Sequence, residues 1–242
     1  MKQNSVERAA LDAALLRLQL DFDDEIRQKL LKHLKLVIEK NQVLNLTRIT
    51  SPAEAVILHI EDSLSIYKYF CQYNGEFLDI GTGAGFPGIP LAISSGRKGT
   101  LLDSVKKKIT AVNEFITELD LSEQIEAVGI RSEELAEKRR NYYGIVVARA
   151  VSSLPAVEEL ATPLLEKNGV LIAMRGNDSI KDVNLGVQAA KKLGLELIDR
   201  NEFNIGPDGE FSRSVCIFKK TGDATLKLPR HPGYASKKPI VS

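Results

Sequence analysis

The sequence predicts an α/β fold with a doubly wound, mostly parallel sheet that ends in an antiparallel hairpin. Three observations support this prediction. From Glu76 onward, short β-rich runs alternate with helical ones, as in right-handed βαβ units. Near the C-terminus, residues 196–204 and 212–219 flank the turn GPDG with no helix between them. Before Glu76, apolar residues recur at helical spacing, so a helical extension precedes the sheet.

The residues before Gly75 are expected to form helices. Apolar residues repeat every three to four positions over 11–18 and again over 26–38. A third helix is predicted to begin at the capping box SPAE, residues 51–54, and to stop at Asn74-Gly75. We therefore expect a helical appendage that is distinct in pattern from the rest of the chain.

After Gly75 the predicted strands and helices alternate. The strands are expected at 76–80, 99–103, 125–130, 144–149 and 169–174. The helices are expected at 87–95, 106–119, 133–140, 154–166 and 179–193. Three parts follow: an N-terminal helical extension at 1–75, a ligand-binding α/β domain at 76–220 and a basic tail at 221–242.

The composition is that of an ordinary globular protein. With 242 residues, 43% of them hydrophobic and 27% charged, the chain has room for one large domain and a small appendage. Cys71 and Cys216 form no C-x-x-C motif, so we expect two buried thiols in a reducing cytosol, with no disulfide and no metal site. The charged N-terminus predicts neither a signal peptide nor a membrane span, so a cytoplasmic location is expected. A net charge of +1 argues against indiscriminate nucleic-acid binding.

Residues 77–91, FLDIGTGAGFPGIPL, form the strongest candidate for a cofactor site. An apolar strand runs into glycines that let the backbone approach a ligand closely. From Gly81 the pattern acidic-x-G-x-G-x-G is typical of S-adenosylmethionine (SAM) methyltransferases, whereas from Gly83 the pattern G-x-G-x-x-G matches the dinucleotide fingerprint. A tight turn without any ligand is the third interpretation.

Pro87 and the terminal hairpin favour SAM over a dinucleotide. The glycines of a dinucleotide site open a helix whose N-terminal amides meet a pyrophosphate. Pro87 would remove one of these amides, which is harmless for SAM because SAM carries no phosphate. The second half of a dinucleotide domain would also continue with βαβ units where this chain is expected to form a hairpin.

The carboxyl ends of the next two strands carry candidate cofactor ligands, because ligands bind at this edge of an open α/β sheet. Asp103 ends the second strand, where a carboxylate can accept both ribose hydroxyls; the alternative is an acid that caps a helix. After the third strand, the backbone of Ser132 and the side chain of Glu133 are candidates for adenine contacts. A serine N-cap followed by first-turn glutamates explains these residues equally well.

Arg149 is the candidate catalytic residue. It ends the hydrophobic fourth strand between Ala148 and Ala150, at the same edge of the sheet. An arginine in this place is difficult to explain as part of a solvated face. We therefore predict a catalytic or substrate-orienting role, with a structural salt bridge as the alternative.

Two more groups have open interpretations. His59 and Asp62 share one helical face and either form a hydrogen-bonded pair or line the cleft together with residues 45–47. Lys106 to Lys108 form either a solvated helical face or a set of phosphate contacts.

Over nearly its whole length the chain resembles the ribosomal RNA small subunit methyltransferase G family, also called glucose-inhibited division protein B. The matching segments are NLT at 45–47, H-x-x-D-S-L at 59–64, DIGTGAGFPGIPLAI at 79–93, LLDS-x-x-K-K at 101–108, R-S-E-E at 131–134, ARAV at 148–151 and P-R-x-P-G at 229–233. The extension of the glycine motif by Phe86-Pro87-Gly88 is distinctive of this family.

The resemblance implies a Rossmann-like class I SAM-dependent methyltransferase fold, with residues 76–220 as the SAM-binding domain. It also implies methyl transfer from SAM to N7 of a guanine in 16S rRNA, at the position conventionally numbered 527. The partner would be 16S rRNA or the small ribosomal subunit, and we expect a monomer without a membrane or metal partner. The family's cofactor contacts fall on Gly81, Phe86, Ser132, Glu133 and Arg149, to which we add Asp103 as a ribose ligand.

The chain departs from the family pattern in three places. Ser132 stands where alanine is usual, Arg175 stands where lysine is common, and the tail continues YASKKPI after Gly233. A backbone contact at Ser132 should tolerate the first change, so the departures affect the tail more than the cofactor site.

The implied chemistry needs no general base, because guanine N7 has a lone pair and no proton. We predict that Arg149 orients the cofactor, O6 or a phosphate, and that Phe86 serves the base as well as the cofactor by stacking. The lysines at 106–108 and the tail would bind phosphates. The alternatives are an NAD(P)-dependent oxidoreductase and a non-catalytic ribosome-binding factor on the same fold.

Overall fold

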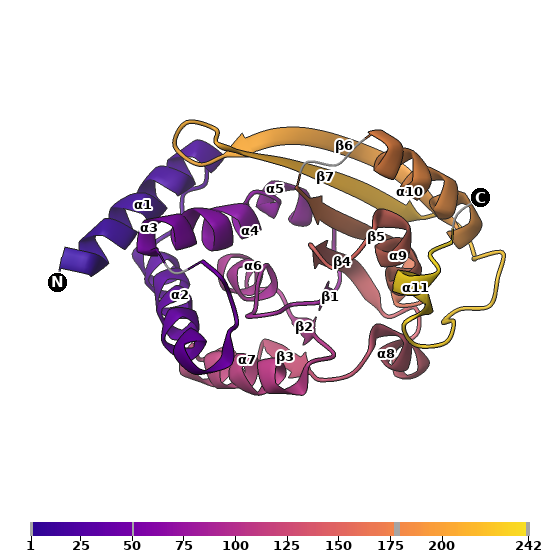
Figure 1. Cartoon of the computed structure of the whole chain (residues 1–242), viewed down its shortest axis with the longest axis horizontal. Coiled ribbons are helices and arrows are strands. Elements are labelled where there is room, and N and C mark those ends of the chain that lie inside the picture. The colour runs from indigo at the N-terminus through magenta and orange to yellow at the C-terminus, as the bar shows by residue number, and fades with distance from the viewer. Residues whose placement is uncertain (1, 50, 177–179, 241–242) are drawn as a thin grey trace.

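The computed structural model describes residues 2–49, 51–176 and 180–240, and their dominant feature is a single seven-stranded sheet (Figure 1). The strand order is β3-β2-β1-β4-β5-β7-β6. The strands are β1 (Phe77–Ile80), β2 (Gly99–Leu102), β3 (Ile125–Val128), β4 (Tyr143–Arg149), β5 (Leu165–Arg175), β6 (Leu195–Ile205) and β7 (Phe211–Lys220). The strands β1 to β5 pair in parallel, whereas β7 pairs antiparallel with both β5 and β6. The predicted doubly wound sheet with a terminal hairpin is confirmed.

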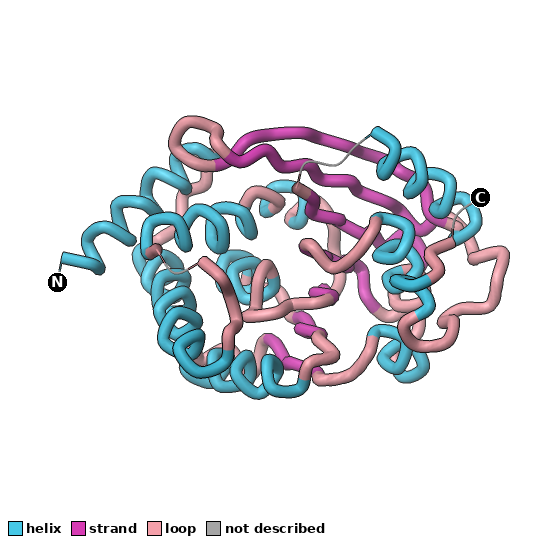
Figure 2. Tube along the Cα trace, viewed as in Figure 1, coloured by secondary structure: helices cyan, strands magenta, loops and turns pink. Residues whose placement is uncertain are grey.

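Helices cover both faces of this sheet (Figure 2). The helices that follow β1 to β5 are α6 (Gly88–Ser95), α7 (Lys106–Glu118), α8 (Ser132–Lys138), α9 (Leu154–Ala161) and α10 (Ile180–Leu193), and α11 (Tyr234–Lys237) lies in the tail. Buried residues of α6 and α7 pack in one hydrophobic cluster, and those of α8, α9 and α10 pack in the other. The order in which the strands are added to the sheet reverses between β1 and β4, which is where ligands bind in such sheets.

The strand β4 shows how the two clusters arise from sequence. Ile145 and Val147 belong to one cluster, while Val146 and Ala148 belong to the other. Because successive side chains of a strand point to opposite faces, a continuous apolar run is needed where both faces are covered. The strand is thus apolar throughout, and Arg149 at its end is the exception.

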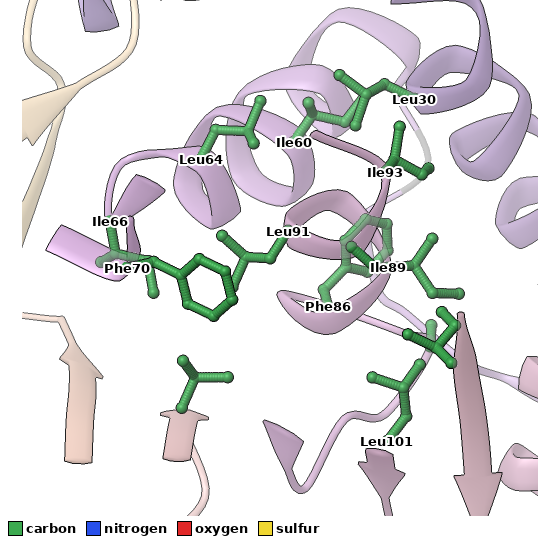
Figure 3. Packing of buried hydrophobic residues seen from close by; sticks show 14 of the residues in the cluster. Leu30, Ile60, Leu64, Ile66, Phe70, Phe86, Ile89, Leu91, Ile93 and Leu101 are labelled. Atoms are coloured by element: carbon green, nitrogen blue, oxygen red, sulfur yellow. The ribbon is translucent and has the colours of Figure 1, made fainter. Parts of the chain in front are cut away.

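The N-terminal helices are α1 (Lys2–Leu18), α2 (Asp24–Leu44), α3 (Pro52–Ala55), the π-helix η1 (Val56–Glu61), α4 (Asp62–Leu64) and α5 (Tyr67–Phe70). They share a hydrophobic cluster with α6 and the sheet: Leu30, Ile60 and Phe70 pack near Ile89 and Leu91 (Figure 3). Among the described helices, none has the length and apolar composition of a membrane span. The division of the chain at residues 75 and 220 stays a prediction.

Several local predictions are wrong. The third helix is interrupted, with η1 inside it, and the side chain of Ser51 makes no capping hydrogen bond. The helix expected to reach residue 166 ends at Ala161, before Pro163, and β5 already begins at Leu165 because it pairs with Tyr143. Cys216 is buried as expected, but Cys71 is exposed.

Glu158 in α9 is a buried acid whose carboxylate oxygens have no hydrogen-bond partner among the described residues. Burial raises the pKa of Glu158 to about 9. An acid whose folded pKa lies above its unfolded value favours the fold at low pH, and this contribution is lost progressively as pH rises from the unfolded pKa to the folded pKa. From this group we expect the free energy of unfolding to fall by about 3 kcal/mol between pH 4.5 and pH 7.

The substitution Glu158→Gln should flatten that part of the profile in urea titrations. The matched control is Glu137→Gln, because Glu137 is exposed on α8 and should leave the profile unchanged. Equal slopes for wild type and Glu158→Gln would contradict the prediction.

Candidate functional site

Two cavities meet at the carboxyl ends of β1 and β4. The first, which we call the Asp103 cavity, has a volume of about 340 Å³, and its lining includes Asp103, Lys108, Ser132, Glu133, Val151, Gly233 and Ser236. The second, the Arg149 cavity, has a volume of about 410 Å³, and its lining includes Thr47, His59, Asp62, Phe86, Arg149, Arg175 and Arg213. Gly81 and Ala150 line both, so the two cavities adjoin. All the predicted site residues therefore lie at one of these two cavities.

The glycine loop connects β1 to α6 and forms the boundary between the cavities. Gly81 has a φ of +76°, which favours glycine, and a Cβ added there would lie 2.6 Å from Val151 Cγ2. The first amide of α6, Gly88 N, donates to Asp79 Oδ2 at 2.9 Å. Asp79 is fully buried, and burial raises its pKa to about 6. Because a carboxylate of the chain occupies this amide, the helix N-terminus is unsuited to a pyrophosphate, in line with the interpretation of Pro87.

Asp103, which follows β2, braces the glycine loop from the Asp103 cavity. Its Oδ2 accepts from Gly83 N at 3.2 Å and its Oδ1 accepts from Val105 N at 2.9 Å. Lys108 Nζ lies 3.8 Å from Oδ2, whereas Lys106 and Lys107 are exposed. The carboxylate thus binds the amide of Val105, which is the N-cap of α7, and it lines the cavity, while its role as a ribose ligand stays a prediction.

Ser132 and Glu133 begin α8 and line the Asp103 cavity. The N-cap is Arg131, so the alternative of a serine cap is wrong, and Ser132 Oγ instead donates to Leu160 O at 3.1 Å. Glu133 Oε1 accepts from Gly233 N at 2.8 Å. The C-terminal tail therefore reaches the Asp103 cavity, and no pattern in the sequence predicted this contact.

The carboxylate of Asp62 holds the side chain of Arg149 in place. Its Nη1 donates to Leu58 O at 3.0 Å and to Asp62 Oδ2 at 2.9 Å, and Arg213 Nε donates to Asp62 Oδ1 at 2.6 Å. The side chain of Asp62 is 7% exposed. We call Asp62, Arg149 and Arg213 the arginine clamp, because one buried carboxylate fixes two guanidinium groups beside the Arg149 cavity.

The imidazole of His59 stacks on Phe86, with the ring centroids 4.6 Å apart and the planes 11° from parallel. His33 lies 4.5 Å from Phe86 by the same measure, and Arg149 Cζ lies 5.5 Å from the ring centroid. Phe86 is only 3% exposed, so the expectation that a substrate base stacks on it is wrong. Its ring supports the cavity wall instead.

His59 is a neutral wall residue rather than a partner of Asp62. Its Nε2 is hydrogen-bonded to Thr47 Oγ1 at 3.0 Å, and the carboxylate of Asp62 bonds to Arg149 and Arg213 rather than to this ring. Burial, and then the charge of Arg149, lower the pKa of His59 to about 3; burial likewise lowers the pKa of His33 to about 3. Both imidazoles are therefore uncharged near neutral pH. His59 and Asp62 line the cavity together with residues 46 and 47, which is the second of the two interpretations that the sequence left open.

Arg213 is the site residue that sequence reasoning missed. It lies on β7, which is inserted between β5 and β6. From the sequence alone, a charged residue in a hairpin at the edge of a sheet is expected to face solvent. Its position shortly after the turn at 206–209 does not predict a contact with Asp62. Its hydrogen bond to Asp62 shows that this side chain reaches the Arg149 cavity.

Comparison with known proteins agrees with this architecture. A family model described as rRNA small subunit methyltransferase G matches residues 26–206. The chain is 39% identical to a ribosomal RNA small subunit methyltransferase G of Acetivibrio thermocellus over 92% of both chains. It is 36% identical to the protein of the same name from Alkaliphilus metalliredigens, over 90% of this chain and 92% of that protein.

A solved structure with a similar fold is the O-methyltransferase from Bacillus cereus in complex with SAH. The TM-score is 0.58, with 17% identity, over 87% of this chain and 97% of that one. This likeness confirms the predicted class I methyltransferase fold. Taken with the two joined cavities and the matched family model, it leads to one conclusion: the chain belongs to the ribosomal RNA small subunit methyltransferase G family.

Proposed function

We propose that this protein transfers the methyl group of SAM to N7 of a guanine in 16S rRNA, at the position numbered 527, in the small subunit of the ribosome. The observation that supports this best is the meeting of the two cavities at Gly81 and Ala150. One cavity offers carboxylates to a nucleoside, and the other offers guanidinium groups to an anionic or carbonyl-bearing acceptor. Family membership favours this activity over both the oxidoreductase and the non-catalytic factor.

The Asp103 cavity fits the nucleoside end of SAM. In this proposal the carboxylate of Asp103 accepts the ribose hydroxyls, while Ser132 and Glu133 contact the adenine. Gly81, Phe86 and Arg149 lie toward the methionine end, where Gly81 permits close approach because it has no Cβ. When bound, SAM supplies an electrophilic methyl group on its sulfonium.

The Arg149 cavity would hold the guanine. Guanine N7 carries no proton, so no residue has to remove one, and the neutral His59 is consistent with this. The contribution of the protein is then alignment, for which well-oriented reactions gain on the order of 7 to 11 kcal/mol. We infer that Arg149 and Arg213 bind O6 or a phosphate and leave N7 free, since a bidentate contact to O6 and N7 would block the reaction.

Basic groups outside the cavities would bind the rest of the RNA. Lys106 and Lys107 are exposed beside the Asp103 cavity, and the tail carries further basic residues. Phosphate contacts of this kind make affinity depend on salt. We further propose that the protein acts as a cytoplasmic monomer, and that the helical extension, methyltransferase domain and tail are functional parts with the boundaries given above.

The test is methyl transfer from tritiated SAM to small-subunit particles that lack the modification. Label should appear at one guanine and be released by chemistry specific for N7-methylguanine, whereas particles that already carry the methyl group should accept none. No transfer, or label at another atom, would refute the proposal. Thermal stabilisation by NADH but not by S-adenosylhomocysteine (SAH) would revive the oxidoreductase.

The substitution Gly81→Ala should weaken SAH binding by at least about tenfold in calorimetry. Its Cβ would lie 2.6 Å from Val151 Cγ2 at a φ of +76°, on the boundary of both cavities. Gly96→Ala is the matched control, because Gly96 has a φ of +68° but no atom within 4 Å of the added Cβ. Both variants carry the backbone strain, so an equal loss of SAH affinity in the two would contradict a site role for Gly81.

A further inference from the structure

The C-terminal tail is attached to the body of the protein by an ion pair between Arg230 and the buried Glu159. Arg230 Nε donates to Glu159 Oε1 at 2.7 Å, Nη2 donates to Oε2, and Nη2 also donates to Lys238 O at 2.7 Å. The side chain of Glu159, on α9, is only 4% exposed. In Figure 1 the tail loops around the end of the sheet and places α11 beside α9. One arginine thus ties both ends of residues 230–238 to the same helix.

The attached tail reaches the Asp103 cavity. Gly233 and Ser236 are part of its lining. They lie far from Asp103 and Gly81 in the sequence but line the same cavity. Gly233 N donates to Glu133 Oε1 at 2.8 Å, and Glu133 is 8% exposed. This bond fixes the carboxylate of Glu133 and leaves Oε2 for a ligand.

We propose that Gly233 and Ser236 of the tail form the outer wall of the nucleoside end of the cofactor site, and that Arg230 is the positioning residue that holds this wall in place. The inference rests on the proposed function, since it assigns the Asp103 cavity to SAM. Small-molecule sites bury most of the ligand surface, and here the tail supplies one side of the enclosure. The tail therefore controls how tightly the cofactor is retained, while the arginine clamp acts at the other cavity.

Two neighbouring positions on α11 give a direct test in the full-length chain. Ser236 and Lys237 are both exposed, but only Ser236 lines the cavity. In calorimetry with SAH, Ser236→Phe should raise the dissociation constant at least about tenfold because the ring enters the space of the nucleoside. Lys237→Phe should leave it unchanged, and equal dissociation constants for the two variants would overturn the proposal.

Arg230 is tested by a split between kinetic constants. Arg230→Ala should raise the KM for SAM about tenfold and leave kcat at saturating SAM unchanged, since the wall contacts no acceptor group. Arg230→Lys keeps the charge beside Glu159 and should restore part of the affinity. A tenfold fall in kcat without any change in the KM for SAM would contradict the assigned role. If Arg230→Ala fails to fold in a melting experiment, the Ser236 and Lys237 pair decides.

The outcomes separate this inference from the proposed function. If the wild-type protein binds no SAH, the assignment of the cofactor fails, and the wall fails with it. If the wild type binds SAH while Ser236→Phe and Arg230→Ala bind it equally well, only the role of the tail is refuted.

Discussion

Arg149→Ala is expected to reduce methyl transfer by about 10³-fold while the protein stays folded. The loss follows from the place of Arg149, which ends β4 inside the second cavity and is held there by Leu58 O and Asp62. Asp62 keeps its bond to Arg213 in the variant, so the buried carboxylate still has a partner. Single-turnover transfer at saturating SAM, together with a melting curve, measures both parts of the prediction.

Arg149→Lys is the companion variant. A lysine keeps the positive charge but lacks the planar group that reaches a carbonyl and a carboxylate at once. We expect activity between that of the wild type and that of Arg149→Ala. Normal turnover in the alanine variant would mean that Arg149 forms only a structural salt bridge, which is the alternative that the sequence left open.

Asp62→Ala is expected to lower kcat at saturating SAM by about 10²-fold. The substitution removes the acceptor that fixes Arg149 and Arg213, and the two guanidinium groups would then repel each other. Neither arginine would stay at the position that orients the acceptor. The measurement is kcat at saturating rRNA particles combined with calorimetry for SAH.

Glu61→Gln controls for the loss of a buried acid next to Asp62. Glu61 pairs with Arg17 through two bonds of 2.8 and 2.7 Å and is 1% exposed, but it lines neither cavity. We expect Glu61→Gln to lower the melting temperature and to keep its turnover. If Glu61→Gln loses as much turnover as Asp62→Ala, the effect of Asp62 is one of stability and not of the clamp.

The strands and most helices could be predicted because local pattern determines them. The apolar runs of β1 and β4 mark strands buried on both faces, and the turn at 206–209 marks the hairpin. The carboxyl ends of β2 and β4 then pointed to Asp103 and Arg149, because the topology of such sheets brings those ends to one edge. Resemblance to a known family supplied the substrate and the atom to be methylated.

What escaped prediction depends on contacts between distant segments. The clamp joins residues 62, 149 and 213 from three elements, and no local pattern encodes that meeting. The bond from Gly233 to Glu133 spans the distance between the tail and α8. The stack of His59 on Phe86 likewise needed the position of η1 against the glycine loop. Spacing along the chain says little about such pairs, because packing decides them.

The shared boundary at Gly81 and Ala150 has a consequence for chemical inhibition. A single bisubstrate compound, with an adenosine joined to a purine by a short linker, could fill both cavities. Binding of its first half would raise the effective concentration of the second, as in other linked ligands. Selectivity would then come from the combination, since one compound would have to match the carboxylates of the first cavity and the guanidinium groups of the second.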